Sequence, residues 1–277
     1  MEISSLLFRT EAIFWKQHCQ IEDLGDALII TAPDNPTWNW GNYLLLDSAP
    51  AASDVKRWTQ LIESKIFKNR ESRYYLITWQ HGLIDDDALT AFDEFGLEKT
   101  DGEVLRLGRL SKPLHWNDDI EVVEIDGDDP LWPEIVQLDI DSFLEQNRSP
   151  GYAAYATKRM ADHKSLVSKG IAQWFIARLN GELVGAVGLY PGQNLYRYQE
   201  VAVKKEYRRR GIASTMIYEV AQRAFEANPH FDQVIVAISD GEAKSVYKAL
   251  GFELDSLSYA LSGRKQVHDT ATDSSEP

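Results

Sequence analysis

The order of apolar and polar residues in the second half of the chain predicts strands and helices that follow one another closely. Two apolar runs stand on either side of Asn180-Gly181, and Asn-Gly is typical of the tight turn in a β-hairpin. Further along, apolar residues at helical spacing predict a helix from Gly211 to Ala227. The other elements expected in this half are strands at 120–125, 173–179, 183–190, 198–203 and 234–239, and helices at about 128–143, 152–168 and 243–250.

A domain boundary is expected near Pro113, where a periodic pattern gives way to an irregular one. Proline restricts the residue before it and interrupts regular structure. We therefore expect one domain at 1–113, a second at 118–262 and a polar, disordered tail at 263–277. The elements expected in the first domain are strands at 27–32, 42–47 and 74–79, and helices at 54–66 and 86–95.

The end of the first half is similar to the end of the second. Residues 88–98 align without gaps with residues 243–253, and both segments place an Ala, an aromatic residue and a Gly at intervals of four positions. Unrelated helices also carry such a spacing, because many end in glycine. A duplication is the favoured interpretation, in which Phe92 stands where the second copy has Tyr247.

Composition limits the classes of partner. The 277 residues carry a formal net charge of −14, which disfavours nucleic acid and anionic membranes, since binding to phosphates depends on Lys and Arg. A cationic amine is compatible with this charge. The single cysteine, Cys19, excludes an internal disulfide. The start lacks the pattern of a signal peptide and no apolar run has the length of a membrane span, so a cytoplasmic protein is expected.

The segment 207–214 carries the strongest chemical signal in the chain. It follows a predicted strand, contains three consecutive arginines and opens a predicted helix at Gly211. The first N–H groups of a helix have no partner within it, and the helix dipole adds partial positive charge, so a phosphate is expected to bind there. Small residues at Gly211 and Ala213 allow a pyrophosphate to approach the backbone. The chain lacks the G-x-x-x-x-G-K-[ST] and strand-to-helix G-x-G-x-x-G motifs that usually hold ATP and NAD.

The pattern Arg208-x-x-Gly211-x-Ala213 resembles the acyl-CoA signature of the GNAT acetyltransferase superfamily, in which Gln or Arg leads, Gly follows and Gly or Ala closes. The order of elements agrees with that family: a hairpin comes before, and a strand and a helix that ends in Gly251-Phe252 come after. The resemblance implies an α/β fold with a mixed sheet, complete and GNAT-like in the C-terminal domain. The N-terminal domain is expected to be a partial, degenerate GNAT-like fold, because residues 48–53 lack the leading Arg and the Gly.

The resemblance also implies acetyl-CoA as the donor substrate. No metal is expected, because the six histidines are scattered and none forms an H-E-x-x-H motif or a His/Cys pair. The donor is expected to lie between two splayed parallel strands, 198–203 and 234–239, where backbone groups without a strand partner can bond to its amides. The acceptor is expected to be a primary amine, on a small molecule or a peptide, that attacks directly in a ternary complex. The rival interpretation is a non-catalytic acyl-CoA sensor or partner-binding module. The residues expected to contact the donor are Val201, Ala202, Val203, Arg208, Arg209, Arg210, Gly211, Ile212, Ala213, Ser214, Asp240 and Tyr247.

Two residues are expected to carry out the chemistry. Glu200 occupies a position where many family members carry a general base, and the alternative is a carboxylate in solvent or in an ion pair. Tyr247 matches the family's tyrosine that protonates or hydrogen-bonds to the leaving sulfur, and the alternative is a buried aromatic residue with a backbone partner. Asp240 stands where many relatives have an Asn that bonds to the cofactor. Its carboxylate can accept but not donate there, and capping the next helix is its other candidate role.

Overall fold

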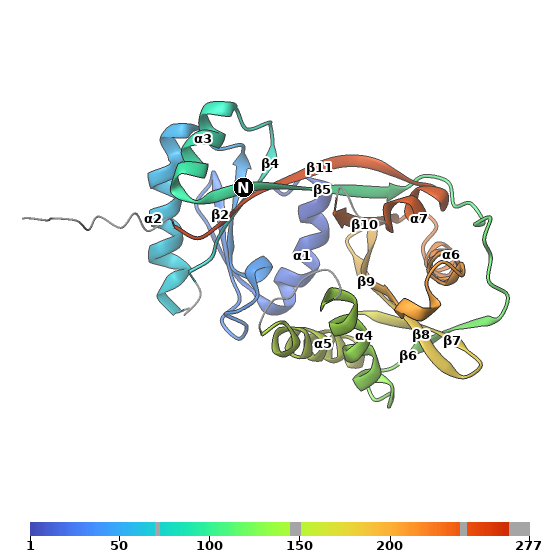
Figure 1. Cartoon of the computed structure of the whole chain (residues 1–277). Helices are drawn as coiled ribbons and strands as arrows, with labels where there is room; N and C mark the ends of the chain where they lie inside the picture. Colours follow the sequence, from blue (N-terminus) through green and yellow to red (C-terminus); the bar gives the residue numbers. More distant parts are fainter. Residues whose placement is uncertain (70–72, 145–150, 239–242, 266–277) are drawn as a thin grey trace, which may run out of the picture. The chain divides into compact units, whose positions relative to one another are not determined.

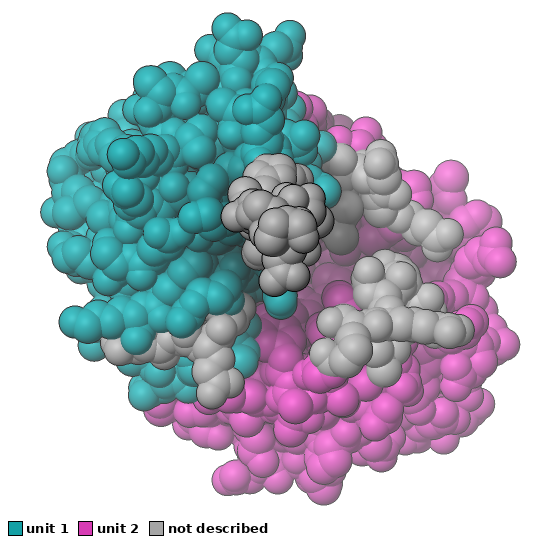
Figure 2. All heavy atoms as spheres, turned by 60° about the vertical axis from the view of Figure 1, so that its left-hand side comes forward, with its two compact units in different colours: residues 1–3, 15–101, 258–277 teal, residues 4–14, 102–257 magenta. Residues whose placement is uncertain are grey.

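The computed structural model describes residues 1–69, 73–144, 151–238 and 243–265. The chain divides into two compact units, which Figure 2 shows in different colours. Unit 1 comprises Met1–Ile3, Trp15–Asp101 and Ser258–Pro277, and unit 2 comprises Ser4–Phe14 and Gly102–Leu257. All the residues expected to bind the donor or to act in catalysis belong to unit 2.

A mixed sheet forms the centre of unit 2 (Figure 1). Its strands β9 and β10 run parallel, whereas the neighbours β5–β10, β9–β8, β8–β7 and β7–β6 are antiparallel. The backbone has positive φ at both Asn180, 51°, and Gly181, 84°, which is the geometry of the favoured hairpin turn. The predicted hairpin is therefore confirmed. In spatial order the strands are β5 (Leu97–Leu107, in unit 2 from Gly102), β10 (Asp232–Ile238), β9 (Leu195–Val203), β8 (Glu182–Gly192), β7 (Gln173–Leu179) and β6 (Ile120–Ile125).

Helices pack on both faces of this sheet. Phe175 of β7 belongs to the same buried apolar cluster as Met216 of α6. Its neighbour Trp174 contacts Trp132 of α4, at 5.3 Å between ring centroids, and His163 of α5, at 5.5 Å. Because successive residues of a strand point to opposite faces, α6 lies on one face and α4 and α5 on the other. The helices are α4 (Trp132–Leu144), α5 (Tyr152–Ser168), α6 (Ile212–Ala227), α7 (Ala243–Ala249) and the 3₁₀ turn η4 (Lys205–Tyr207).

The strands of unit 1 also pair as a mixed sheet, in which β3 and β4 run parallel and the pairs β1–β2, β2–β3 and β4–β11 are antiparallel. Trp58 and Ile62 of α2 and Phe92 of α3 are buried against this sheet in one apolar cluster. The strands are β1 (Gln20–Asp23), β2 (Ala27–Thr31), β3 (Tyr43–Ser48), β4 (Tyr75–His81) and the end of β11 (Phe252–Gly263). The helices are α2 (Val55–Lys65), α3 (Asp86–Phe95) and the 3₁₀ turns η1 (Asn39–Gly41), η2 (Ala52–Asp54) and η3 (Phe67–Asn69).

The two halves of the chain exchange their last strands. The helices α3 and α7 both stop at a glycine with positive φ, Gly96 at 104° and Gly251 at 98°, as the aligned sequences predicted. The strand after α3, β5, pairs through residues 102–106 with β10. The strand after α7, β11, pairs through residues 260–263 with β4. Each compact unit therefore combines separate segments of the chain. The assignment of domains to 1–113 and 118–262 stays a prediction.

The mixed α/β fold expected from the sequence is confirmed, and several predicted elements have the observed bounds, including β6, β7, α3 and α5. The helix α1 (Leu6–His18) and strand β1 were not predicted. Strand β11 continues to Gly263, the first residue of the expected tail, and residues 266–277 of that tail lie outside the described part. Among the helices described, none has both the length and the apolar character that crossing a membrane requires.

Candidate active site

Strands β9 and β10 part in the middle of the sheet of unit 2. Within the described residues, their parallel ladder ends at the pair Arg197–Val234. Beyond it, β9 stays paired with β8 as far as Val203, and β10 stays paired with β5 as far as Ile238. The two edges that face each other are thus free of a strand partner, and a ligand with amide groups can bond to them. The predicted splay is confirmed, and Val201, Ala202 and Val203 lie along it.

Glu200 lies at a β-bulge on the open strand. The ladder with β8 pairs Gly188 with Gln199 and Ala186 with Ala202, so β9 has one residue more than its partner at this point. Glu200 has a φ of 50°, in the left-handed region that non-glycine residues seldom adopt. A bulge bends its strand and turns a side chain out of the regular alternation. The bulge begins three residues beyond the last pair with β10.

The Glu200 carboxyl is held by Arg159 of α5. Arg159 Nη2 lies 3.2 Å from Glu200 Oε2 and donates hydrogen bonds of 2.8 Å to both carboxylate oxygens of Asp139 on α4. The same nitrogen lies 3.2 Å from the Tyr152 hydroxyl oxygen. Only 18% of the Glu200 side chain is exposed. Glu200 is therefore a largely buried, ion-paired carboxyl and not a carboxylate in solvent.

Burial raises the pKa of Glu200 to about 7, because loss of solvent disfavours the charged form. The positive charges of Arg159 and Arg197 lower this pKa, and the nearby Asp139 carboxylate raises it. Such a carboxyl can both accept and release a proton near neutral pH, which is the condition that general acid–base catalysis sets.

Tyr247 of α7 shares the electrostatic environment of Glu200. Its side chain is buried, and its ring meets that of Phe252 edge to face at 6.3 Å. Burial raises the pKa of Tyr247 to about 12, the positive charge of Arg197 lowers it, and the Glu200 carboxylate raises it. The phenol therefore keeps its proton at neutral pH and can donate it.

Arg197, the last residue of β9 to pair with β10, is a buried cation with several partners. Its guanidinium donates to the Tyr198 carbonyl oxygen at 3.1 Å, to Gln199 Oε1 at 3.3 Å and to Thr10 Oγ1 at 2.8 Å. The Glu11 carboxylate lies 3.7 Å away. Thr10 and Glu11 belong to α1, so the part of this helix in unit 2 reaches the point where the strands part.

The turn before α6 is fixed by a segment that precedes β6. The Asn117 side chain donates to the Arg210 carbonyl oxygen at 2.8 Å, and the Asn117 N–H donates to Thr215 Oγ1 at 3.0 Å. Gly211 caps α6 with a φ of 76°, and a Cβ there would lie 2.2 Å from the His115 carbonyl oxygen. The missing side chain of Gly211 thus makes room for the protein's own backbone. It does not by itself indicate a bound phosphate.

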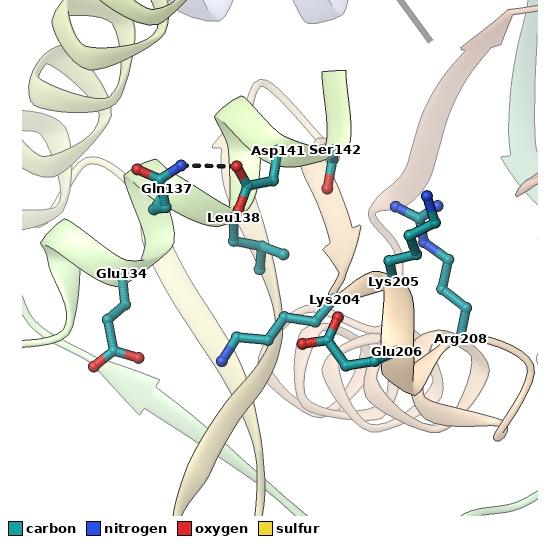
Figure 3. Close-up of a pocket in the computed structure, with 9 residues that line it drawn as sticks. All are labelled: Glu134, Gln137, Leu138, Asp141, Ser142, Lys204, Lys205, Glu206 and Arg208. Carbon is teal, nitrogen blue, oxygen red and sulfur yellow. Dashed lines mark hydrogen bonds between the residues drawn. The ribbon is translucent and has the colours of Figure 1, made fainter. Parts of the chain in front are cut away.

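A cavity of about 670 Å³ opens between α4 and the segment that joins β9 to α6 (Figure 3). Lys205 and Arg208 lie next to each other on one wall, and Asp141 lies on the opposite wall, on α4. Lys204 forms an ion pair of 2.9 Å with Glu182. The cavity wall thus carries both cations and carboxylates, three of each. It is lined by Glu134, Gln137, Leu138, Asp141, Ser142, Lys204, Lys205, Glu206 and Arg208.

Comparison with known proteins identifies the domain that holds this site. Residues 132–252 match the model of the acetyltransferase (GNAT) family, a range that runs from α4 to the start of β11 and includes Glu200 and Tyr247. The chain contains a GNAT domain. Membership of this acetyltransferase family supports acetyl transfer as the general activity of the GNAT domain. A search of curated proteins finds no match to the sequence.

Solved structures share the GNAT fold at low sequence identity. A conserved protein of unknown function from Staphylococcus epidermidis has a TM-score of 0.73 at 14% identity, over 93% of this chain and 100% of its own. A GCN5-related N-acetyltransferase from Kribbella flavida has a TM-score of 0.65 at 12% identity, over 94% and 96%. A tandem GNAT protein from the clavulanic acid biosynthesis pathway has a TM-score of 0.52 at 14% identity, over 77% and 69%. These likenesses concern the fold.

The structure brings Glu200, Val201, Ala202, Val203 and Tyr247 to the place where β9 and β10 part. The expected phosphate-binding residues, 208–214, form the neighbouring turn and the start of α6. Asp240 lies outside the described residues, and its role stays a prediction. Among the described residues, no group of three or more His, Cys, Asp or Glu side chains is arranged to hold a metal ion.

Sequence reasoning missed the charged residues that surround Glu200, namely Asp139, Arg159 and Arg197. Asp139 and Arg159 stand in predicted helices with no motif around them. One signal was available for Arg197, since a charged residue within an apolar strand pattern must find a buried partner.

We predict that Gly211→Ala destabilises unit 2 by about 1 kcal/mol or more beyond the loss caused by Gly181→Ala. Both glycines have positive φ, 76° and 84°, so the backbone strain of the two variants is similar. Only at residue 211 does the added Cβ meet a backbone oxygen, whereas at residue 181 nothing lies within 4 Å. Urea unfolding measures the difference, and equal losses in the two variants contradict the rigidity of the turn.

Proposed function

We propose that the GNAT domain transfers an acetyl group from acetyl-CoA to a primary amine, by direct attack within a ternary complex. One observation carries the proposal: the opened edges of β9 and β10 lie beside a carboxyl with a pKa of about 7 and a phenol that keeps its proton. Those are the two groups that such a transfer requires. The family match over residues 132–252 supports the type of reaction.

The donor has a natural place along the open edge of β9. The pantetheine arm carries two amides, which can bond to the backbone groups of Val201, Ala202 and Val203 that lack a strand partner. The pyrophosphate would then reach the start of α6, where the N–H groups of Ile212, Ala213 and Ser214 belong to the first helical turn. Lys205 and the arginines at 208–210 come directly before α6 in the sequence, and their positive charge favours phosphate at this end.

Glu200 takes up the proton that the acceptor must lose. An alkylamine has a pKa of about 10 and is protonated at neutral pH, so it becomes a nucleophile only after a base removes a proton. A main-chain N–H of the open strand stabilises the negative charge that grows on the thioester oxygen. Tyr247 donates its proton, or a hydrogen bond, to the sulfur as the carbon–sulfur bond breaks. No covalent enzyme intermediate is required.

The first half of the chain completes the fold without sharing this chemistry. Phe92 of α3 has no hydroxyl at the position that aligns with Tyr247, and residues 48–53 lack the Arg and Gly of the signature. We propose that this half is a degenerate GNAT-like domain that does not bind acyl-CoA.

The second candidate function is a non-catalytic acyl-CoA sensor or partner-binding module. The ion pair of Glu200 with Arg159 favours it, because a carboxylate tied to a cation at 3.2 Å is a weaker base than a free one. The pKa of about 7 favours the enzyme, since it leaves Glu200 able to exchange a proton near neutral pH.

The proposed activity is tested by release of free thiol from acetyl-CoA in the presence of polyamines, amino acids, aminoglycosides and peptides with a free N-terminus. We expect release that depends on one class of amine, together with calorimetric binding of coenzyme A. The double variant Lys205→Ala/Arg208→Ala should weaken that binding and reduce its dependence on salt. Binding without any amine-dependent release contradicts catalysis and supports the sensor, and a lack of binding contradicts both functions.

Glu200→Gln is expected to lower turnover at pH 7–8 by about 10²-fold, because a positioned base contributes on that order. The wild-type rate should rise with pH as Glu200 loses its proton and level off above about pH 7, in line with the pKa. The rate of the variant should keep rising towards the pKa of the amine, at about 10, since only the neutral amine reacts. A pH–rate profile measured for both proteins decides the matter, and identical profiles exclude Glu200 as the base.

Tyr247→Phe is expected to lower turnover by about 10²-fold while the affinity for coenzyme A changes little, because the hydroxyl acts on the leaving sulfur. The matched control is Tyr218→Phe on α6, whose ring packs against Trp116 at 5.5 Å and which should keep full turnover. Steady-state rates and calorimetry measure both effects. Full activity in Tyr247→Phe assigns the residue to the core alone.

A further inference from the structure

Three elements of unit 2 contribute to one buried charged group, of which the proposed chemistry uses only Glu200. Asp139 comes from α4, Arg159 from α5 and Glu200 from the bulge of β9. A single nitrogen, Arg159 Nη2, contacts both carboxylates and the Tyr152 hydroxyl. Arg159 Nε is buried and has no hydrogen-bond partner among the residues that the structure describes. The guanidinium is thus held in position chiefly by the two carboxylates.

We propose that Arg159, oriented by Asp139, is a positioning residue that decides whether the Glu200 carboxyl is ionised when an acceptor arrives. Its effect on turnover rests on the proposed function. The ionisation of Glu200 itself is a property of the free protein and can be measured without any reaction.

Arg159 lies closer to the Asp139 carboxylate than to the Glu200 carboxyl. Arg159 Nη2 lies 2.8 Å from both oxygens of Asp139 but 3.2 Å from one oxygen of Glu200. Asp139 therefore acts on Glu200 in two ways that raise its proton affinity: it competes for the cation, and it adds a like charge nearby. Without Arg159, the buried Glu200 would stay protonated at neutral pH. If Arg159 were paired with Glu200 alone, the Glu200 carboxyl would ionise readily and would be too weak a base.

The phenols that face Glu200 do not ionise near neutral pH. Burial raises the pKa of Tyr152, Tyr155, Tyr190 and Tyr247, so these phenols stay neutral. The Tyr190 hydroxyl shares a hydrogen bond of 2.6 Å with His163 Nδ1. The remaining cation, Arg197, is engaged by Thr10, Gln199 and Glu11. Among the charged groups, Arg159 and Asp139 act more strongly on the Glu200 carboxyl than Arg197 does.

The test uses two variants that break the same ion pair and move Glu200 in opposite directions. Arg159→Met removes the cation and leaves Asp139, so the pKa of Glu200 should rise by about one unit or more. Asp139→Asn removes the competing carboxylate and releases the arginine, so the pKa should fall by a similar amount. In the full chain labelled with ¹³C-carboxyl glutamate, NMR titration follows Glu200, whose signal is the one absent from Glu200→Gln.

Lys158→Met is the matched control, because it removes a positive charge from the adjacent position of α5. Lys158 is 45% exposed and pairs with Asp162 at 4.0 Å, so its loss should leave the titration of Glu200 unchanged. Arg159→Lys should restore part of the wild-type value. If Arg159 and Asp139 had a purely structural role, Arg159→Met and Asp139→Asn would both lower activity without shifting the pKa of Glu200 in opposite directions.

Shifts in the same direction, or none, overturn the proposal, and circular dichroism establishes that each variant is folded. Should Arg159→Met fail to fold, Asp139→Asn, which preserves size and shape, still tests the proposal through the downward shift. The pH–rate profile then separates the effect of Arg159 on Glu200 from the role of Glu200 as the base. Opposite shifts by NMR with an unmoved rate profile uphold the role of Arg159 and reject Glu200 as the base.

Discussion

The parting of β9 and β10 at the pair Arg197–Val234 is the constraint on which the site depends. A strand in the middle of a sheet normally satisfies both edges, and opening one edge has a cost in unpaired backbone groups. Here each strand keeps its outer neighbour, β8 for β9 and β5 for β10, so the sheet holds together on both sides of the opening. The bulge at Glu200 lies on the same open strand and takes this side chain out of the regular alternation of the strand.

The helices around the site supply the partners that its buried charges need. Arg197 and Glu200 are both largely buried, and a buried charge is stable only when it is paired and hydrogen-bonded. The partners come from far along the chain: Thr10 and Glu11 from α1, Asp139 from α4 and Arg159 from α5. The network that holds the charges also sets their proton affinities, because an arginine shared between two carboxylates satisfies neither fully.

How far the sequence predicts this structure depends on the distance between the residues that decide each feature. Some features depend on one or two local residues with positive φ, and these were predicted. They are the hairpin at Asn180-Gly181, the helix stops at Gly96 and Gly251 and the start of α6 at Gly211. Glu200 and Tyr247 were predicted through a family resemblance. The contact of Arg159 with Glu200 spans 41 positions of the sequence, and nothing near either residue in the sequence indicates it. The exchange of β5 and β11 was missed for the same reason, since strand pairing between distant segments leaves no local pattern.

That exchange gives the first half of the chain a structural role beside the candidate site. Strand β10 has β9 as its neighbour only over residues 232–234, so β5 supplies most of its pairing, through residues 102–106. Without β5, β10 would be unpaired on both sides over residues 235–238. Of the two strands at the opening, only β9 would then be held by a neighbouring strand. An unpaired apolar strand is also prone to pair with other chains. The first half of the chain therefore has a structural role at the candidate site, because it supplies the strand that fixes β10, although Phe92 stands at the position that aligns with Tyr247.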